Sequence, residues 1–102
     1  MQEVKVQATQ DGELIIALCG ELHSVNAEEF LNVTLLAYEK SPLDLTFDCK
    51  ELNFLDSTAL GTFVKIFKTL KADGKKMRLI NLQAKLKKLF VICSLDTIME
   101  IA

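Results

Sequence analysis

The chain has 102 residues, of which 50% are hydrophobic and 25% charged, and its formal net charge is −2. This length predicts a single domain over residues 1–102, and the composition excludes disordered, collagen-like and low-complexity proteins. No apolar run approaches the roughly 20 residues of a membrane span, and the slightly negative charge argues against general nucleic-acid binding.

The first two predicted elements are strands. Apolar residues alternate with polar ones over residues 4–9, which predicts a half-buried strand, and the Asp-Gly pair at residues 11–12 predicts a hairpin turn. The apolar run of residues 14–19 predicts a second, more central strand that ends at Gly20.

A helix and a third strand follow. Asn26, with Glu29 three residues later, predicts a helix N-cap and its capping-box partner. Ser41-Pro42 predicts the end of this helix, because the residue before a proline avoids the helical conformation. Alternating apolar residues then predict a strand over residues 43–48.

The second half of the chain predicts two more helices and one more strand. A helix is expected to begin near Ser57 and to stop at Asp73-Gly74. Its apolar stripe has helical spacing and comprises Leu60, Phe63, Val64, Phe67 and Leu70. Residues 77–82 predict a strand and residues 86–93 a helix, whereas residues 98–101 have no firm assignment.

The element order is therefore β-β-α-β-α-β-α. Strand-helix-strand units imply parallel pairing after an antiparallel first hairpin. We expect an α/β fold with a mixed, mostly parallel sheet, with the helices packed on one face and the other face open to water.

Three cysteines, Cys19, Cys49 and Cys93, lie far apart in apolar stretches. A disulfide framework has a denser and usually even set of cysteines, and a zinc site needs close cysteine or histidine pairs. We therefore expect three reduced, largely buried thiols and no metal or other cofactor. Together with N-terminal residues that lack the layout of a signal peptide, they predict a cytoplasmic protein.

The charges are unevenly distributed along the chain. Residues 1–56 have three basic and eleven acidic side chains, whereas residues 57–102 have nine basic and three acidic ones, which gives net charges of −8 and +6. Two interpretations are open. The signs mix on a solvated surface once the chain folds, or the basic side chains form a face that meets an acidic partner.

Short polar side chains gather where the third strand passes into the second helix, at Asp56, Ser57 and Thr58. In the purely structural interpretation, Asp56 or Ser57 caps the helix. In the functional interpretation, the turn displays a hydroxyl where backbone N–H groups and the helix dipole favour negative charge. The fold would tolerate a phosphate on Ser57, and this group would add about −1.5 to −2 charge beside Asp56.

A nucleophilic serine is the competing chemistry, and it needs a base. His23 is the only histidine, and Leu55 and Ala59 occupy the positions where a nucleophile elbow has glycines. The four glycines are dispersed and form neither a P-loop nor a dinucleotide-binding loop. We therefore expect that the chain is not an enzyme.

Residues 43–48 and 52–61, the latter reading LNFLDSTALG, resemble the signature of the STAS domain, the domain of bacterial anti-sigma factor antagonists. Supporting pieces are Gly20-Glu21-Leu22, Asp73-Gly74, and residues 86–90 before Ser94-Leu95. The resemblance covers essentially the whole chain in the same element order, and it implies the STAS fold.

The resemblance also implies a mechanism. An unphosphorylated antagonist binds a serine kinase that is also an anti-sigma factor and thereby frees the sigma factor. The kinase phosphorylates the serine after the signature aspartate, which breaks the complex, and a metal-dependent serine phosphatase reverses the step. By position the acceptor here is Ser57, preceded by Asp56, and Thr58 is a weaker candidate. ATP and Mg²⁺ belong to the kinase.

Two positions depart from the family pattern. His23 stands where the family commonly has an aspartate near the phosphorylation site, and Ala59 replaces the first glycine of the usual Ser-Gly-Leu-Gly. Two interpretations of His23 are open: it makes partner binding sensitive to pH, or it is an ordinary surface or loop residue. The expected partner-binding residues are Asp56, Ser57, Thr58, His23, Gly61, Lys65 and Lys68.

Two other functions stay open. STAS subunits also serve as structural partners in lipid-transport ABC complexes, although these commonly have threonine at the acceptor position, where this chain has Ser57. The third function is a small-ligand-binding or enzymatic domain. For the antagonist we expect a monomer whose partners include neither nucleic acid nor a membrane.

Overall fold

The computed structural model describes residues 4–10 and 12–102, with side chains described from Gly12 onward. The chain forms a five-stranded sheet with three α-helices and one short 3₁₀ helix in the described range. The elements are β1 (Val4–Gln10), β2 (Glu13–Leu22), α1 (Ala27–Lys40), β3 (Asp44–Leu55), α2 (Ser57–Ala72), β4 (Met77–Ile80), α3 (Ala84–Ile92), η1 (Leu95–Thr97) and β5 (Glu100–Ile101).

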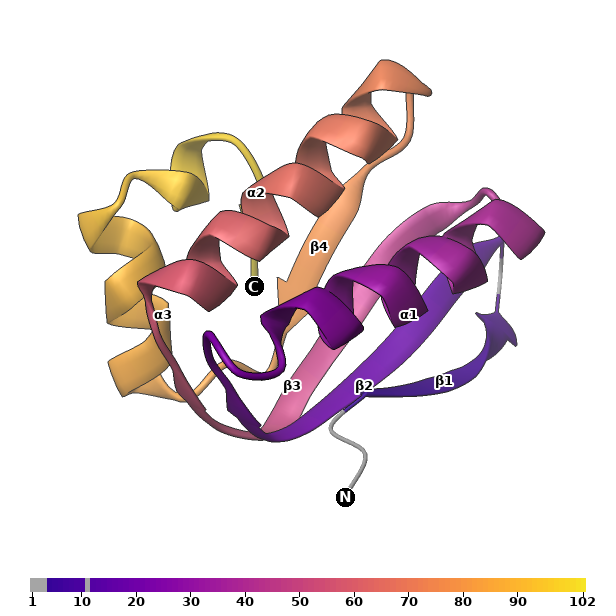
Figure 1. The fold of residues 1–102 in the computed structure, drawn as a ribbon. Helices are drawn as coiled ribbons and strands as arrows, with labels where there is room; N and C mark the ends of the chain where they lie inside the picture. Colours follow the sequence, from indigo (N-terminus) through magenta and orange to yellow (C-terminus); the bar gives the residue numbers. More distant parts are fainter. Residues whose placement is uncertain (1–3, 11) are drawn as a thin grey trace.

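The sheet confirms the predicted α/β topology. Its strand order is β1-β2-β3-β4-β5, with an antiparallel β1–β2 pair followed by parallel pairs. Because β2, β3 and β4 run the same way, their carboxyl ends meet at one edge of the sheet. Figure 1 shows α1 and α2 side by side over one face of the sheet.

All three helices pack into one core on that face. Phe30 of α1, Phe47 of β3 and Phe63 of α2 contact one another edge to face, with ring centroids 5.0–5.7 Å apart. Phe90 of α3 joins Phe63 with centroids 5.5 Å apart. These four rings are fully buried, so one aromatic cluster fixes each helix against β3.

The predicted hairpin joins β1 and β2. Gln10 pairs with Glu13, and Gly12 has a φ of +76°, which glycine adopts without strain. Asp11 lies outside the described residues, as do the side chains of β1, so the alternating burial expected for residues 4–9 stays a prediction.

The predicted ends of two strands are wrong. Gly20 does not end β2 but lies in a bulge with a φ of +74°, and the strand continues to Leu22. This extension pairs with a second half of β3, which runs to Leu55 rather than ending at residue 48. The pairing of residues 19–22 in β2 with the second half of β3 thus lengthens both strands. Neither segment indicates this extension by its own sequence.

The C-terminal segment forms structure that the sequence left unassigned. After α3 the chain makes η1 and then β5, which pairs in parallel with Arg78 and Leu79 of β4. β4 is also shorter than predicted and ends at Ile80, because Asn81 adopts a φ of +61° that turns the chain out of the sheet.

Asn26 is at the N-cap of α1 as predicted, but the capping box is absent. Its side chain makes no cap hydrogen bond. The amide instead accepts from the His23 N–H at 2.9 Å and donates to the Glu21 carbonyl at 2.8 Å. Asn26 therefore braces the loop before the helix.

The cysteines differ in burial, against the expectation that all three are largely buried. Cys49 is buried, Cys19 is partly exposed and Cys93 is exposed at the end of α3. Desolvation by burial, with a smaller effect of the neighbouring Asp48, raises the pKa of the Cys49 thiol to about 12. This thiol packs as a small hydrophobic side chain.

Candidate functional site

The candidate site lies where the carboxyl ends of β2 and β3 meet. Leu22 and Leu55 are paired in the last rung of the parallel ladder. The next residue, Asp56, donates its N–H to the Leu22 carbonyl at 3.2 Å. The loop before α1 and the first turn of α2 therefore leave the sheet next to each other (Figure 1).

Asp56 binds both of these segments through its carboxylate. Oδ1 accepts from the Ala59 N–H at 2.9 Å, which caps α2, and Oδ2 accepts from the Ser24 N–H at 3.0 Å. The Ala59 hydrogen bond lowers the pKa of Asp56 most; partial desolvation opposes it, and the Ser24 N–H, the nearby His23 and the Thr58 N–H add to the lowering. The capping residue is thus Asp56 rather than Ser57.

Ser57 and Thr58 form the exposed first turn of α2. Across the described part of the chain, the Ser57 hydroxyl has no hydrogen bond to another protein group. The Thr58 carbonyl accepts from the Thr62 hydroxyl at 3.1 Å, one turn further along. Because Asp56 already caps the helix, the Ser57 hydroxyl is not needed for the fold and faces solvent.

The side chain and carbonyl of His23 make their hydrogen bonds within the loop before α1 and not with Ser57. Its Nδ1 accepts from the Val25 N–H at 3.3 Å, and its Nε2 lies 3.7 Å from a carboxylate oxygen of Glu21. Its carbonyl accepts from the N–H groups of Asn26 and Ala27. Nδ1 is engaged within the loop and Nε2 lies beside Glu21 of β2, so in the part of the chain that the structure describes neither ring nitrogen is hydrogen-bonded to Ser57, as a base for a nucleophilic serine would be.

Gly61, Lys65 and Lys68 follow Ser57 along the exposed surface of α2. Spacings of four, four and three residues place the four positions on one helical face. Lys68 lies about 16 Å from Ser57 along the axis at 1.5 Å per residue, so the stripe extends well beyond the first turn. We call these four residues the α2 stripe.

The fold does not require a glycine at position 61. A Cβ built at this position meets nothing within 4 Å, and its φ is not positive. Glycine inside a helix costs about 1 kcal/mol relative to alanine. A glycine that destabilises its helix and faces open space is suited to the close approach of another molecule.

A groove of about 410 Å³ lies beside this turn, between α1 and α2. Thr58 and Lys65 were predicted from the sequence as site residues, whereas the α1 side of the groove was not. The groove is lined by Ser24, Ala27, Glu28, Leu31, Asn32, Thr58, Thr62 and Lys65. Only the packing of the two helices brings these residues together, and no local motif indicates the α1 members. Val25, in the loop nearby, is 87% exposed.

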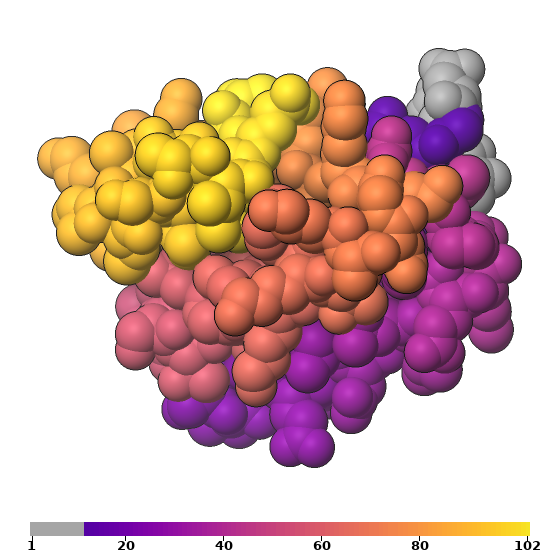
Figure 2. Space-filling view, turned by 90° about the horizontal axis from the view of Figure 1, so that it is seen from above, coloured from indigo at the N-terminus to yellow at the C-terminus, as the bar shows by residue number. Residues whose placement is uncertain are grey.

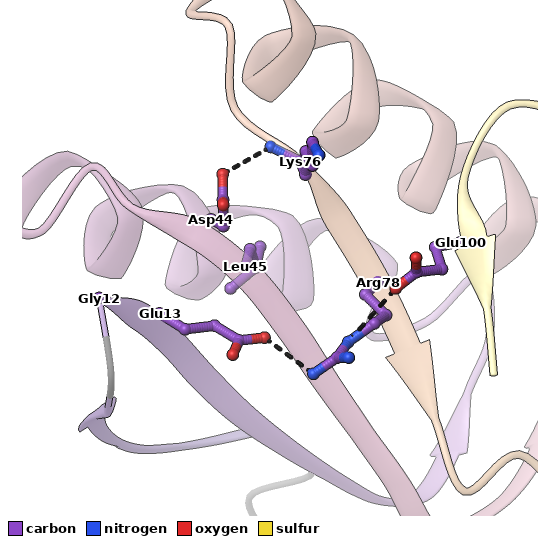
Figure 3. A pocket seen from close by; sticks show the side chains of 7 residues that line it. All are labelled: Gly12, Glu13, Asp44, Leu45, Lys76, Arg78 and Glu100. Atoms are coloured by element: carbon purple, nitrogen blue, oxygen red, sulfur yellow. Dashed lines mark hydrogen bonds and ion pairs between the residues drawn. The ribbon is translucent and has the colours of Figure 1, made fainter.

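A second hollow lies at the opposite edge of the sheet, where the parallel strands begin. Figure 3 shows Arg78 between Glu13 and Glu100, with N–O distances of 3.2 and 3.5 Å. The Lys76 backbone N–H donates to Asp44 at 2.9 Å. These contacts join β2, β3, β4 and β5 and leave the carboxylates paired. The side chains around this hollow therefore stabilise the sheet.

Neither hollow has the composition of a metal centre. Within residues 4–10 and 12–102, no cluster of three or more histidine, cysteine or acidic side chains could hold a metal ion. In the same part of the chain, no helix is both long and apolar enough to cross a membrane.

Comparison with known proteins assigns the family. The family model of the STAS domain matches residues 5–102. A relative from Bacillus subtilis (strain 168), named anti-sigma-B factor antagonist, is 32% identical over 92 residues, which are 90% of this chain and 84% of the relative.

Solved structures show the same fold at lower identity. An anti-sigma factor antagonist from Mycobacterium paratuberculosis superposes with a TM-score of 0.84 at 18% identity, covering 96% of this chain and 82% of that one. The Bacillus cell fate determinant SpoIIAA in its phosphorylated form superposes with a TM-score of 0.74 at 21% identity, covering 97% and 90%. With its mixed sheet, its capped signature helix and a match over residues 5–102, the chain belongs to the STAS domain family.

Proposed function

We propose that this protein is an anti-sigma factor antagonist controlled by phosphorylation of Ser57. Unphosphorylated, it binds an anti-sigma factor that is also a serine kinase. Phosphorylation releases the partner, and a metal-dependent serine phosphatase restores the binding form. The chain itself supplies an acceptor hydroxyl and a docking surface and catalyses no reaction.

The observation that carries the proposal is the free Ser57 hydroxyl on a turn already capped by Asp56. An acceptor for a kinase must be exposed, and its modification must leave the domain folded. Ser57 is exposed, and α2 is capped by the hydrogen bond that the Asp56 carboxylate accepts from the Ala59 N–H. The cap therefore does not depend on the serine hydroxyl, which supports the proposal on both points. The adjacent N–H groups and the helix dipole stabilise a phosphate at this place.

Phosphate transfer would change the docking surface through charge. The Ser57 Oγ attacks the γ-phosphorus of ATP bound to the kinase, the hydroxyl proton passes to a base of the kinase, and ADP leaves. The new phosphate adds about −1.5 to −2 charge next to the Asp56 carboxylate. A partner surface that accepts the neutral serine then faces two adjacent anionic groups, which weakens the complex.

The remaining expected partner contacts are also proposals. The α2 stripe supplies Gly61 for close approach and two lysines for an acidic partner surface. The groove beside Thr58 offers a place for a partner side chain. His23 contributes to partner binding by shaping the loop before α1. Thr58 is the weaker candidate for the phosphate acceptor. The relative of 32% identity that is named an anti-sigma-B factor antagonist supports the proposed antagonist function, and these contacts rest on the geometry alone.

The test uses the anti-sigma factor kinase from the same organism. Incubation with this kinase and ATP should add one phosphate, mapped to Ser57 by mass spectrometry of the fragments. Ser57→Ala should take up none, and Ser57→Asp should lose kinase binding in a pull-down or calorimetric titration. Thr58→Ala is the matched control and should still take up one phosphate.

Two results would contradict the proposal. One is undiminished phosphorylation of Ser57→Ala, which would move the acceptor elsewhere. The other is kinase binding by the phosphorylated protein as tight as by the unmodified protein, which would remove the switch.

A further inference from the structure

A basic groove lies at the opposite end of α2 from Ser57. It has a volume of about 450 Å³ and is lined by Phe67, Lys71, Lys75, Lys76, Met77, Arg78, Ile98 and Glu100. Figure 2 shows this side of the molecule, where the end of α2 and the start of β4 (salmon and orange) lie next to the C-terminal segment (yellow). Lys71 is about 21 Å from Ser57 along the helix axis, so the groove is separate from the candidate site.

Apolar side chains contribute to the lining of the groove. Met77 is buried, Phe67 is half-buried, and Ile98 is 45% exposed beside them. Ile98 comes from the segment after α3, so the C-terminal segment completes the groove against α2 and β4. This apolar surface can take up a side chain from outside the domain.

Three lysines of the groove, Lys71, Lys75 and Lys76, have no carboxylate partner within the described part of the chain. Among the residues that the structure describes, none of them is in an ion pair, and the Lys71 ammonium lies 5.9 Å from the centre of the Phe67 ring. Arg78 differs, because Glu13 and Glu100 already hold its guanidinium. Lysine side chains on an apolar surface without anions of their own fit an acidic ligand.

We propose that the basic groove binds an acidic segment of a partner protein, with an apolar side chain of that segment seated between Phe67 and Ile98. Lys71, Lys75 and Lys76 pair with the carboxylates that flank this side chain. The groove is thus a second docking surface that works without phosphorylation of Ser57.

The other anionic ligands fit the groove less well. A small phosphate compound favours a planar guanidinium fork or converging backbone N–H groups, and the only arginine here is already engaged by two carboxylates. An anionic membrane surface needs a broad cationic face, whereas the exposed carboxylates of Asp73 and Glu100 flank or line this groove. A narrow segment with one apolar residue between acidic residues needs neither a guanidinium fork nor a broad cationic face.

The test is a titration of the full ¹⁵N-labelled chain with synthetic peptides, followed by backbone amide shifts. The probe is an octapeptide of glutamates with one central leucine. We expect concentration-dependent shifts at residues 67–78 and 96–100. A peptide with glutamine in place of glutamate should cause none, and one with serine in place of leucine should bind several-fold more weakly.

Variants separate the groove from general charge. Replacement of Lys71, Lys75 and Lys76 by glutamine should weaken binding of the glutamate peptide at least about tenfold. The matched control replaces Lys85, Lys87 and Lys88 of α3 by glutamine, which removes the same charge from another exposed cluster and should leave binding nearly unchanged. Ser57→Asp should bind the peptide like the unmodified chain, so this test is independent of the proposed switch.

Several results would overturn the inference. One is an equal loss of peptide affinity in the two triple variants. The others are amide shifts that the glutamine peptide reproduces and amide shifts confined to another face of the domain. Inorganic triphosphate or vesicles of anionic phospholipid that move the groove amides, while the peptide moves none, would identify a phosphate or a membrane as the ligand instead. A triple variant with an altered circular dichroism spectrum would be replaced by Ile98→Ser, whose loss of binding tests the apolar part alone.

Discussion

Asp56 uses its two carboxylate oxygens for two different purposes. Oδ1 caps α2 through the Ala59 N–H, whereas Oδ2 holds the loop before α1 through the Ser24 N–H. The first hydrogen bond spans three residues and is typical of any helix start. The second spans 32 residues and fixes the loop of His23 against the turn of Ser57.

Asp56→Asn should separate these purposes. Asparagine keeps an acceptor for the Ala59 N–H and is a good N-cap, but its amide group cannot accept from Ser24. We expect α2 to keep its cap, while hydrogen exchange of the Ser24 amide becomes faster. The measurement is amide exchange by NMR, with Glu51→Gln as a control because Glu51 is an exposed carboxylate of β3.

The same variant should change the dependence of stability on pH. Because the folded state lowers the pKa of Asp56, the carboxylate contributes stability that is complete above the ordinary aspartate pKa of about 4 and is lost as the pH falls through the lowered folded value. Urea unfolding between pH 6 and pH 2 should therefore show a smaller decrease for Asp56→Asn than for the unmodified chain. Identical pH profiles would show that the Asp56 carboxylate is not stabilised by the fold.

At the scale of elements, α2 combines a stabilising N-cap with one residue inside the helix, Gly61, that lowers its stability. The cap comes from Asp56, and the apolar side of the helix is fully buried at Phe63, Ile66 and Leu70. Gly61 on the opposite side costs stability and receives no packing in return. A stable helix tolerates this cost if the glycine serves binding rather than folding.

Gly61→Ala should therefore stabilise the domain and weaken the complex with the kinase. The new methyl group meets no described residue within 4 Å, and alanine in a helix is favoured over glycine by about 1 kcal/mol. Urea unfolding measures the first effect and calorimetric titration with the kinase the second. Thr69→Ala is the control, because this exposed residue of α2 lies away from Ser57 and its replacement should leave binding unchanged. If Gly61→Ala bound the kinase as tightly as the unmodified chain, the glycine would have no role in docking.

The elements that the sequence predicted well are those with local signals. The start of α2 depends on Asp56 and Ala59, three residues apart. Leu60, Phe63 and Leu70 of its predicted stripe are buried. The prediction missed the buried Ile66 and included Val64 and Phe67, which are only half-buried. The second half of β3 and the bulge at Gly20 were missed because each exists only through pairing with the other strand. β5 has two residues and forms because Arg78 and Leu79 offer a free edge of β4.

The same distinction applies to the site. The capping and the exposed serine follow from neighbouring residues, so the sequence could indicate them. The Asp56–Ser24 hydrogen bond and the groove against Glu28 and Asn32 join segments about 30 residues apart. Such contacts depend on how α1 packs on α2, and that packing is decided by the buried aromatic cluster rather than by any local motif.

At the scale of the whole molecule, the charge difference between the two halves of the sequence takes on a spatial meaning. The basic half supplies the lysines of the α2 stripe at one place and the lysines of the basic groove at another. Lys65 also lines the groove beside Thr58, so one positive charge directly borders the proposed acceptor turn. Whether the stripe is a docking face or only a solvated surface depends on its effect on association.

Reversal of Lys65 and Lys68 to glutamate decides between these two interpretations. If the stripe meets an acidic kinase surface, the double variant should bind at least about tenfold more weakly, mainly through slower association, and its affinity should depend less on salt. Association rates measured by surface plasmon resonance at low and high salt test this. The control reverses Lys87 and Lys88 on the exposed side of α3, which changes the net charge equally but outside the α2 stripe. Equal affinities for the stripe variant and the unmodified chain would show that these lysines only form a solvated surface of the helix. An equal loss of affinity in the α3 control would show that the net charge, and not its position on α2, governs association.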